Sequence, residues 1–295
     1  MLKRSDDVTW GNTMTGDGLF VKSGTNTLFL GASMAGFDGT IIAQGGRLRP
    51  TAATAFGTAA GGTFLEAGAA LEINAINFGA EPFTVAGAGP DGLGVLVNSG
   101  GGQNNAFRFV TLSGDATVNA IGRFDVRANP DAAFMGNGHA LTKIGANQFS
   151  LVSVGNTELG DISVLQGTFS VEGNTYLGSN GVMVVTNGAT VMFWGSSQPQ
   201  DKAFALGNGA RLFKDNGTAT LRGGGFITGS NTVEAASNSG TDFTLAGVIG
   251  GDGLLHKQGA GNVFLTADNT YTGGTLVSAG NLFLGNGGGK WLRGG

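Results

Sequence analysis

Apolar and polar residues alternate with a period of two along most of this chain, in short stretches separated by glycine. Leu28 and Leu30 fall on one face of such a stretch, and Val263 and Leu265 repeat the arrangement near the other end. Alternation over a few residues between turn-forming glycines indicates β-strands, whereas a helix would need a longer period that no window shows. The pattern therefore predicts an all-β fold built from short strands.

The same pattern recurs in three repeat-like stretches of the chain. Residues 16–48 and 251–285 align without a gap over most of their length, with Lys22 falling on Lys257, and a looser copy spans 137–173. A repeated coil of ~20 residues buries its inner face only against neighbouring coils. The repeat therefore favours a solenoid over a sandwich or an antiparallel barrel, and we predict a single parallel β-helix over residues 1–295.

In such a solenoid, one of the two alternating sets of side chains points inward and forms the core. We expect the inward set near the end of the chain to include Val263, Leu265, Val277 and Leu282. We also expect five aromatic residues at strand positions to stack in the core, namely Phe20, Phe29, Phe149, Phe264 and Phe283.

The composition agrees with many tight turns between buried strands. Glycine accounts for 57 of the 295 residues but proline for only 5, and there is no three-residue period, which excludes collagen. Because 41% of the residues are hydrophobic, the chain has enough apolar surface to form a core. It contains no cysteine, which excludes disulfides and thiolate chemistry.

Charged residues make up only 12% of the chain, and the formal net charge is −4. A nucleic-acid partner would need a basic patch, and the sequence shows none. No apolar stretch approaches the ~18 residues of a membrane span, so we expect no span within this segment. Asp6, Asp7 and Trp10 stand where a signal peptide would have its apolar core, so we expect any export signal to lie elsewhere.

Residues 259–285 read GAGNVFLTADNTYTGGTLVSAGNLFLG, with an NTYTGGT core at 269–275. This stretch resembles the passenger-associated transport repeat of bacterial autotransporters. The copies at 22–48 and 143–171 keep the frame but depart from the core motif. The resemblance implies a right-handed, single-stranded parallel β-helix displayed on the bacterial cell surface or secreted, and full-length members carry a signal peptide and a C-terminal outer-membrane barrel, which we expect outside this segment.

Two glycine-rich motifs suggest ligand binding at first sight. Residues 87–92 satisfy the G-x-G-x-x-G pattern of dinucleotide-binding folds, and Asp115 follows at a suitable distance for a ribose contact. The pattern needs a helix directly behind it, but the following residues are strand-like. Asp91 and Leu93 also match part of a calcium-binding nonapeptide, yet such sites require tandem copies. We therefore predict a solenoid corner here, with no cofactor and no metal.

The remaining candidates for chemistry are few. His139 and His256 are the only histidines, and each is interpreted as the marker of a turn, because a zinc site needs three or four ligands. Arg123, Asp125 and Arg127 share one face of a strand. Their simplest interpretation is a charge ladder facing solvent, and the alternative is a contact for an anionic sugar.

Three tryptophans lie beside glycines and could be exposed: Trp10, Trp194 and Trp291. Of these, Trp194 is the candidate for a binding patch. We expect no catalytic, cofactor-binding or metal-binding residue in this chain.

These observations favour a non-catalytic scaffold or adhesin segment of an extracellular, surface-displayed protein, with host or matrix surfaces, other cells or glycans as partners. A subunit that assembles into an extracellular fibre or sheath is an alternative, and a polysaccharide-active β-helix enzyme is a second. Residues 285–295 are too glycine-rich to cap the last coil well, so we also expect end-to-end self-association or a hold by neighbouring sequence.

Overall fold

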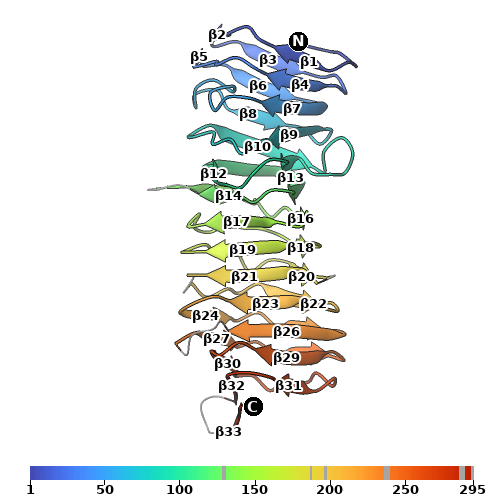
Figure 1. Ribbon diagram of the computed structural model, residues 1–295, viewed down its shortest axis with the longest axis vertical. Helices are drawn as coiled ribbons and strands as arrows, with labels where there is room; N and C mark the ends of the chain where they lie inside the picture. Colours follow the sequence, from blue (N-terminus) through green and yellow to red (C-terminus); the bar gives the residue numbers. More distant parts are fainter. Residues whose placement is uncertain (128–130, 187, 196–197, 236–239, 286–289, 294–295) are drawn as a thin grey trace. The chain divides into compact units, whose positions relative to one another are not determined.

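The computed structural model describes residues 1–127, 131–186, 188–195, 198–235, 240–285 and 290–293, the last four by their backbone alone. The chain divides into two compact units, Met1–Val154 (unit 1) and Gly155–Gly295 (unit 2). The described residues contain strands and no helix, which confirms the predicted all-β fold. In both units parallel strands from successive coils stack into a β-solenoid (Figure 1).

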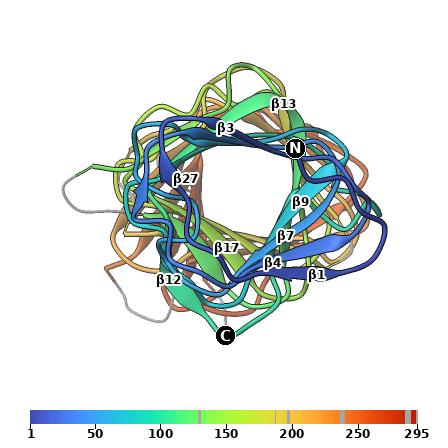
Figure 2. The ribbon, with the colours of Figure 1, turned by 90° about the horizontal axis from the view of Figure 1, so that it is seen from above.

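Unit 1 has three sides, and strands from successive coils pair along each of them (Figure 2). The first side contains, in pairing order, β3 (Leu19–Lys22), β6 (Thr40–Ala43), β8 (Thr63–Leu65), β10 (Pro82–Gly87), β13 (Phe109–Ala120) and β15 (Ala133–Met135). The second contains β1 (Val8–Trp10), β4 (Thr27–Leu30), β7 (Gly46–Pro50), β9 (Ala69–Ile73), β11 (Leu96–Asn98), the second half of β13, and β16 (Leu141–Ile144). The third contains β2 (Thr15–Gly16) with β5 (Gly36–Phe37), and further on β12 (Gln103–Phe107), β14 (Phe124–Arg127) and β17 (Gln148–Val152).

Unit 2 repeats the arrangement. Its first side contains β18 (Ile162–Val164), β20 (Val182–Val185), β22 (Ala203–Leu206), β25 (Gly225–Ile227) and β28 (Ile249–Gly251). Its second contains β19 (Thr168–Glu172), β21 (Thr190–Trp194), β23 (Arg211–Lys214), β26 (Ser230–Ala235), β29 (Leu254–Gln258) and β31 (Thr275–Val277). Its third contains β24 (Thr218–Leu221), β27 (Asp242–Leu245), β30 (Asn262–Leu265), β32 (Asn281–Leu284) and β33 (Lys290–Arg293).

The alternation of the sequence decides which side chains enter the core. Val263, Leu265 and Leu282 are at most 1% exposed, as predicted, and Val263 lies directly opposite Leu282 in the parallel register of β30 and β32. Val277 is only partly buried. It lies in β31, which pairs with β29 on one edge, so a single neighbouring strand packs beside it in the described part of the chain.

The expectation that five strand phenylalanines share the core is correct for two of them and wrong for three. Phe20 and Phe149 are buried. Phe264 instead lies on the outer surface, because Val263 and Leu265 on either side of it take the inward positions. The other two outward rings, Phe29 and Phe283, follow the same rule.

Other rings fill the interior of unit 1. Phe83 lies at the centre of this group, with its centroid 5.4 Å from those of Phe56 and Phe78 and 5.1 Å from that of Phe107. The contacts are edge-to-face, the geometry that the charge distribution of aromatic rings favours. None of these four rings was among the five expected: Phe56 and Phe78 lie in loops, Phe83 lies in β10 and Phe107 lies in β12.

One strand edge near the end of the chain is paired within the same chain. β33 pairs antiparallel with β32, so that Phe283 lies opposite Trp291. The backbone groups of β32 on that edge are thereby paired with a strand of the same chain. End-to-end self-association stays a prediction, since β31 of the second side has a described partner on one edge alone.

Replacing Leu265 by Asp should unfold the coils around β30, because a charge without a partner would enter the core. We expect the free energy of unfolding to fall by at least about 3 kcal/mol. The matched control is Phe264→Asp, one residue along on the outer surface, which should cost less than about 1 kcal/mol. Urea unfolding followed by circular dichroism measures both, and equal losses would contradict the assigned register.

Candidate functional site

The first side of unit 1 presents two columns of outward residues without charged side chains, and the exposed Ser113 and Asp115 lie beyond these columns in β13. Alternation turns one residue in two outward, and register pairing aligns these residues across neighbouring coils. The residues of these two outward columns are Leu19, Val21, Thr40, Ile42, Phe64, Pro82, Thr84, Phe109, Thr111, Ala133 and Met135. We call this surface the uncharged side.

Apolar side chains on the uncharged side are open to solvent. Leu19 is 61% exposed, and Phe64 and Met135 are each 39% exposed. Strands ~4.8 Å apart and two outward columns give a patch of about 300–400 Å². A patch of this size is in the range of the largest apolar patches on monomeric proteins, which often bind partners.

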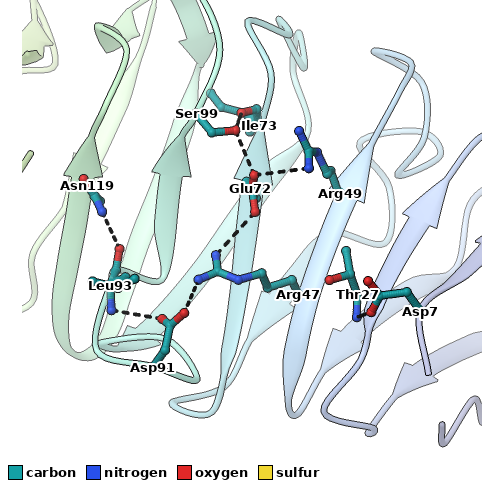
Figure 3. A network of polar contacts seen from close by, with 10 residues as sticks. All are labelled: Asp7, Thr27, Arg47, Arg49, Glu72, Ile73, Asp91, Leu93, Ser99 and Asn119. Atoms are coloured by element: carbon teal, nitrogen blue, oxygen red, sulfur yellow. Dashed lines mark hydrogen bonds and ion pairs between the residues drawn. The ribbon is translucent and has the colours of Figure 1, made fainter. Parts of the chain in front are cut away.

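Charged side chains gather on the second side of unit 1 instead (Figure 3). Arg47 makes an ion pair of 2.5 Å with Asp91 and one of 3.5 Å with Glu72. Arg49 lies 3.5 Å from the other oxygen of Glu72, which also accepts a hydrogen bond of 2.8 Å from the Ser99 hydroxyl. Two cations thus face two carboxylates, and the network is balanced in charge.

The loop between β10 and β11 covers part of this second side. Asn119 donates a 2.8 Å hydrogen bond to the Leu93 carbonyl, while Arg47 holds Asp91 in the same loop (Figure 3). Partial burial works against ionisation of Asp91, but the hydrogen bonds from Arg47 and from the Leu93 amide keep its pKa below the usual value. The half-matched calcium motif therefore has its carboxylate bound to an arginine of the same chain.

The other motifs weighed on the sequence are also accounted for. The G-x-G-x-x-G stretch at 87–92 leads into strand β11 and not into a helix, and Asp115 is exposed. Among the described residues, no three His, Asp or Glu side chains come together as possible metal ligands.

The Arg123–Asp125–Arg127 strand faces solvent only through its arginines. Asp125 is fully buried beneath them, 3.0 Å from the Arg123 guanidinium and 2.8 Å from that of Arg127. The expected charge ladder is thus only partly solvent-facing, because two guanidinium groups close over the carboxylate. Both carboxylate oxygens of Asp125 thus accept hydrogen bonds from guanidinium groups of the same strand.

The two histidines differ in position. His139 lies in a turn as expected, with its amide donating to the Gly136 carbonyl. The expectation for His256 is wrong, since it lies within β29 on the outer surface, where its Nε2 is 2.5 Å from the Ser278 hydroxyl. The Gln258 side-chain nitrogen lies 3.1 Å from Nδ1 and 3.4 Å from Nε2 of the same ring. His256 thus lies in a hydrogen-bonded group with Ser278 and Gln258 on the outer surface.

The tryptophans also differ in their exposure to solvent. Trp194 is 46% exposed, in line with the expectation. Trp10 is partly buried and makes an edge contact with Phe20 at 5.8 Å. The side chain of Trp291 lies outside the described residues.

Sequence reasoning missed a set of buried lysines. Their side chains are at most 1% exposed, and their amino groups donate to backbone carbonyls at the corners of the coils: Lys22, Lys143, Lys202, Lys214 and Lys257. A signal for three of them was present, since Lys22, Lys143 and Lys257 occupy the same place in the three repeats. Each also falls on the inward phase of its strand, two residues after a buried apolar side chain.

Lys257 illustrates how these lysines join two coils. Its Nζ donates to the carbonyls of Gln258 at 2.7 Å, Gly259 at 2.6 Å and Ala279 at 2.9 Å, the last from the following coil. At the equivalent corner of unit 1, Gly46 has a φ of +66° and a Cβ there would stand 2.6 Å from the Lys22 amino group. Only glycine leaves room for the buried amine at that corner.

Burial lowers the pKa of each of these five lysines to about 8. The loss of hydration therefore outweighs the attraction of the carbonyl dipoles for the ammonium. Unfolded lysine holds its proton up to a pH near 10.5, so the fold gains stability as the pH rises from about 8 to 10.5.

Taken together, the coils, the interior lysines and the sorted outer surfaces define a β-solenoid scaffold that presents side chains on its outside. A family model described as the passenger-associated-transport-repeat matches residues 255–282, over the stretch whose resemblance the sequence showed. The chain is also 34% identical over 119 residues to the adhesin BmaC autotransporter of Brucella suis biovar 1 (strain 1330). These findings and the fold confirm that the segment resembles an autotransporter passenger domain.

The similarity to that adhesin covers 39% of this chain but only 4% of the adhesin. No solved structure is a significant match. No helix in the described residues is long and apolar enough to cross a membrane.

Replacing Lys257 by Met should destabilise unit 2, because three corner carbonyls would lose their donor while the apolar stem is kept. We expect a loss of about 2–4 kcal/mol in the free energy of unfolding at pH 8. The advantage of the wild type should grow between pH 8 and pH 10.5, where the folded state has already released the Lys257 proton. Urea unfolding at both pH values, with the exposed Lys3→Met as control, measures this, and an advantage that shrinks with pH would contradict the account.

Proposed function

We propose that this chain is a segment of an adhesive, surface-displayed passenger domain, and that unit 1 contacts its target through the uncharged side. The observation that carries the proposal is the sorting of side chains on unit 1. Charges gather on the second and third sides, whereas the two outward columns of the first side hold only apolar residues and threonines. The adhesin relative supports a role in attachment.

The chemistry of the surface indicates an uncharged, partly apolar patch on a protein of a host or matrix surface as its target. An anionic glycan or an acidic membrane would need basic side chains, and the two outward columns carry none. Arg108 lies beside Phe109, but its guanidinium is paired with Asp131. A second copy of the chain is a poor fit, since a stable dimer buries about 800 Å² on each partner, roughly twice this patch. The patch is suited to weak contacts that gain strength when many copies act together.

Catalysis does not enter the proposal. Asp125 is bound by two arginines, and His256 shares hydrogen bonds with Ser278 and Gln258. Both arrangements support a structural role for these residues. The chain serves as a scaffold that displays the uncharged side.

The test uses the full chain coupled to beads and a decellularised matrix from cultured epithelial cells. Leu19→Ser, Phe64→Ser and Met135→Ser together should lower binding at least about tenfold, because the exposed apolar contacts are removed without a change in the core. The matched control is Phe226→Ser, which removes a 55% exposed phenylalanine from β25 of unit 2 and should leave binding within about twofold.

Salt and enzyme treatment identify the class of target. Binding should change less than about twofold between low and high salt, since apolar contacts are not screened. It should be lost when the matrix is treated with protease and kept when it is treated with glycosidases. Binding that survives the triple substitution, or that fails in high salt, would overturn the proposal.

A further inference from the structure

A buried carboxyl group lies directly beneath the uncharged side. Glu81 precedes β10 and is 5% exposed, because Pro82 points outward and the residues on either side of it point inward. The Thr63 hydroxyl, itself fully buried in β8, donates a 2.8 Å hydrogen bond to Glu81 Oε1. The other oxygen, Oε2, is buried without a hydrogen-bond partner.

The surroundings of this carboxyl group are apolar. Phe83, two residues along from Glu81, lies opposite Thr63 in the register of β8 and β10 and belongs to the aromatic group in the core. An ionised carboxylate would need several donors here, and one threonine hydroxyl supplies a single hydrogen bond. The geometry therefore fits the neutral acid.

Charged groups on the neighbouring strands are directed elsewhere. Arg108 precedes β13, where its guanidinium is bound to Asp131 and lies 5.0 Å from the centre of the Phe109 ring. Glu66, just beyond β8, and Asp115, within β13, are exposed. β6, β8, β10 and β12 themselves carry no charged residue.

The buried pair is in direct chain contact with the surface above it. Thr63 is followed by Phe64, and Glu81 is followed by Pro82, and both of these following residues belong to the uncharged side. A change that pushes Glu81 away from Thr63 must therefore move the backbone that carries Phe64 and Pro82. A displacement of the buried acid therefore changes the positions of residues on the surface above it.

We propose that Glu81 makes the uncharged side sensitive to pH, the neutral acid holding β8 and β10 together and the carboxylate loosening them. This inference rests on the proposed function of that side. Burial raises the pKa of Glu81 to about 7, against a smaller opposite effect of the Thr63 hydrogen bond. The folded state thus keeps a proton that the unfolded chain releases near pH 4.5. Its stabilising effect is complete below that pH and is lost as the pH rises through 7.

Glu81→Gln tests the proposal, since the amide keeps the size of the side chain and cannot ionise. Between pH 4.5 and 7 the unfolding equilibrium constant of the wild-type chain should rise about 100-fold relative to that of Glu81→Gln. Hydrogen exchange should place the extra opening at pH 7 in β8 and β10. Glu66→Gln, an exposed glutamate beside β8, is the control and should behave as the wild type.

Two further readouts separate the possible outcomes. Matrix binding by the wild type should fall several-fold from pH 5.5 to pH 8 and stay constant in Glu81→Gln. If the chain binds no matrix but the stability difference is found, the proposed matrix target is wrong, whereas the pH-dependent stabilisation of β8 and β10 by Glu81 is supported. If Glu81→Gln does not fold, the infrared band of a protonated carboxyl group in the wild-type chain should persist at pH 6. Its disappearance by pH 5, or a pH dependence unchanged in Glu81→Gln, would overturn the inference.

Discussion

In-register stacking of parallel strands is the constraint on which the rest of this structure depends. Each outward or inward position lies directly opposite its counterpart in the coils on either side, at a spacing of ~4.8 Å. Residues aligned in successive coils form a column and contact one another. A residue type that packs well in a column is therefore favoured in every coil, and one that packs badly disturbs the residues above and below it. The column Val21, Ile42, Phe64, Thr84, Thr111 and Met135 shows the consequence on the outer surface.

Buried charge is tolerated within this constraint only when it is isolated along a column. Lys257 lies between Val233 and Val277, and Lys214 lies between Phe193 and Ala235. Stacking two ammonium groups ~4.8 Å apart in the interior would add strong repulsion to the cost of lost hydration. With apolar neighbours on both sides, each amine can instead donate to backbone carbonyls, Lys257 to those of its own and the following coil and Lys214 to that of Phe193 in the preceding coil.

The same sorting separates the roles of the outer surfaces of unit 1. Arginines and carboxylates on the second side neutralise each other and hold the loop that carries Asp91. The third side closes two arginines over Asp125. The two outward columns of the first side have no such charged partners, so their apolar side chains remain free to contact another molecule. Under the proposal, the protonation state of Glu81 beneath them determines how firmly that surface is held.

The sequence by itself determined the strands, the solenoid and the resemblance to passenger repeats, because alternation and repetition are local properties that stacking then reinforces. The same alternation also determined that Phe264 faces outward once Val263 and Leu265 were assigned to the core, although aromatic character suggested otherwise. Only the tertiary structure decided that Glu81 is buried beneath the surface residues and that Asp91 meets Arg47. Those pairings depend on the number of residues in the corners of each coil. This number varies from coil to coil, and the alternation within the strands does not reveal it. The register between coils, and with it every neighbour across the sheet, is fixed by packing in three dimensions.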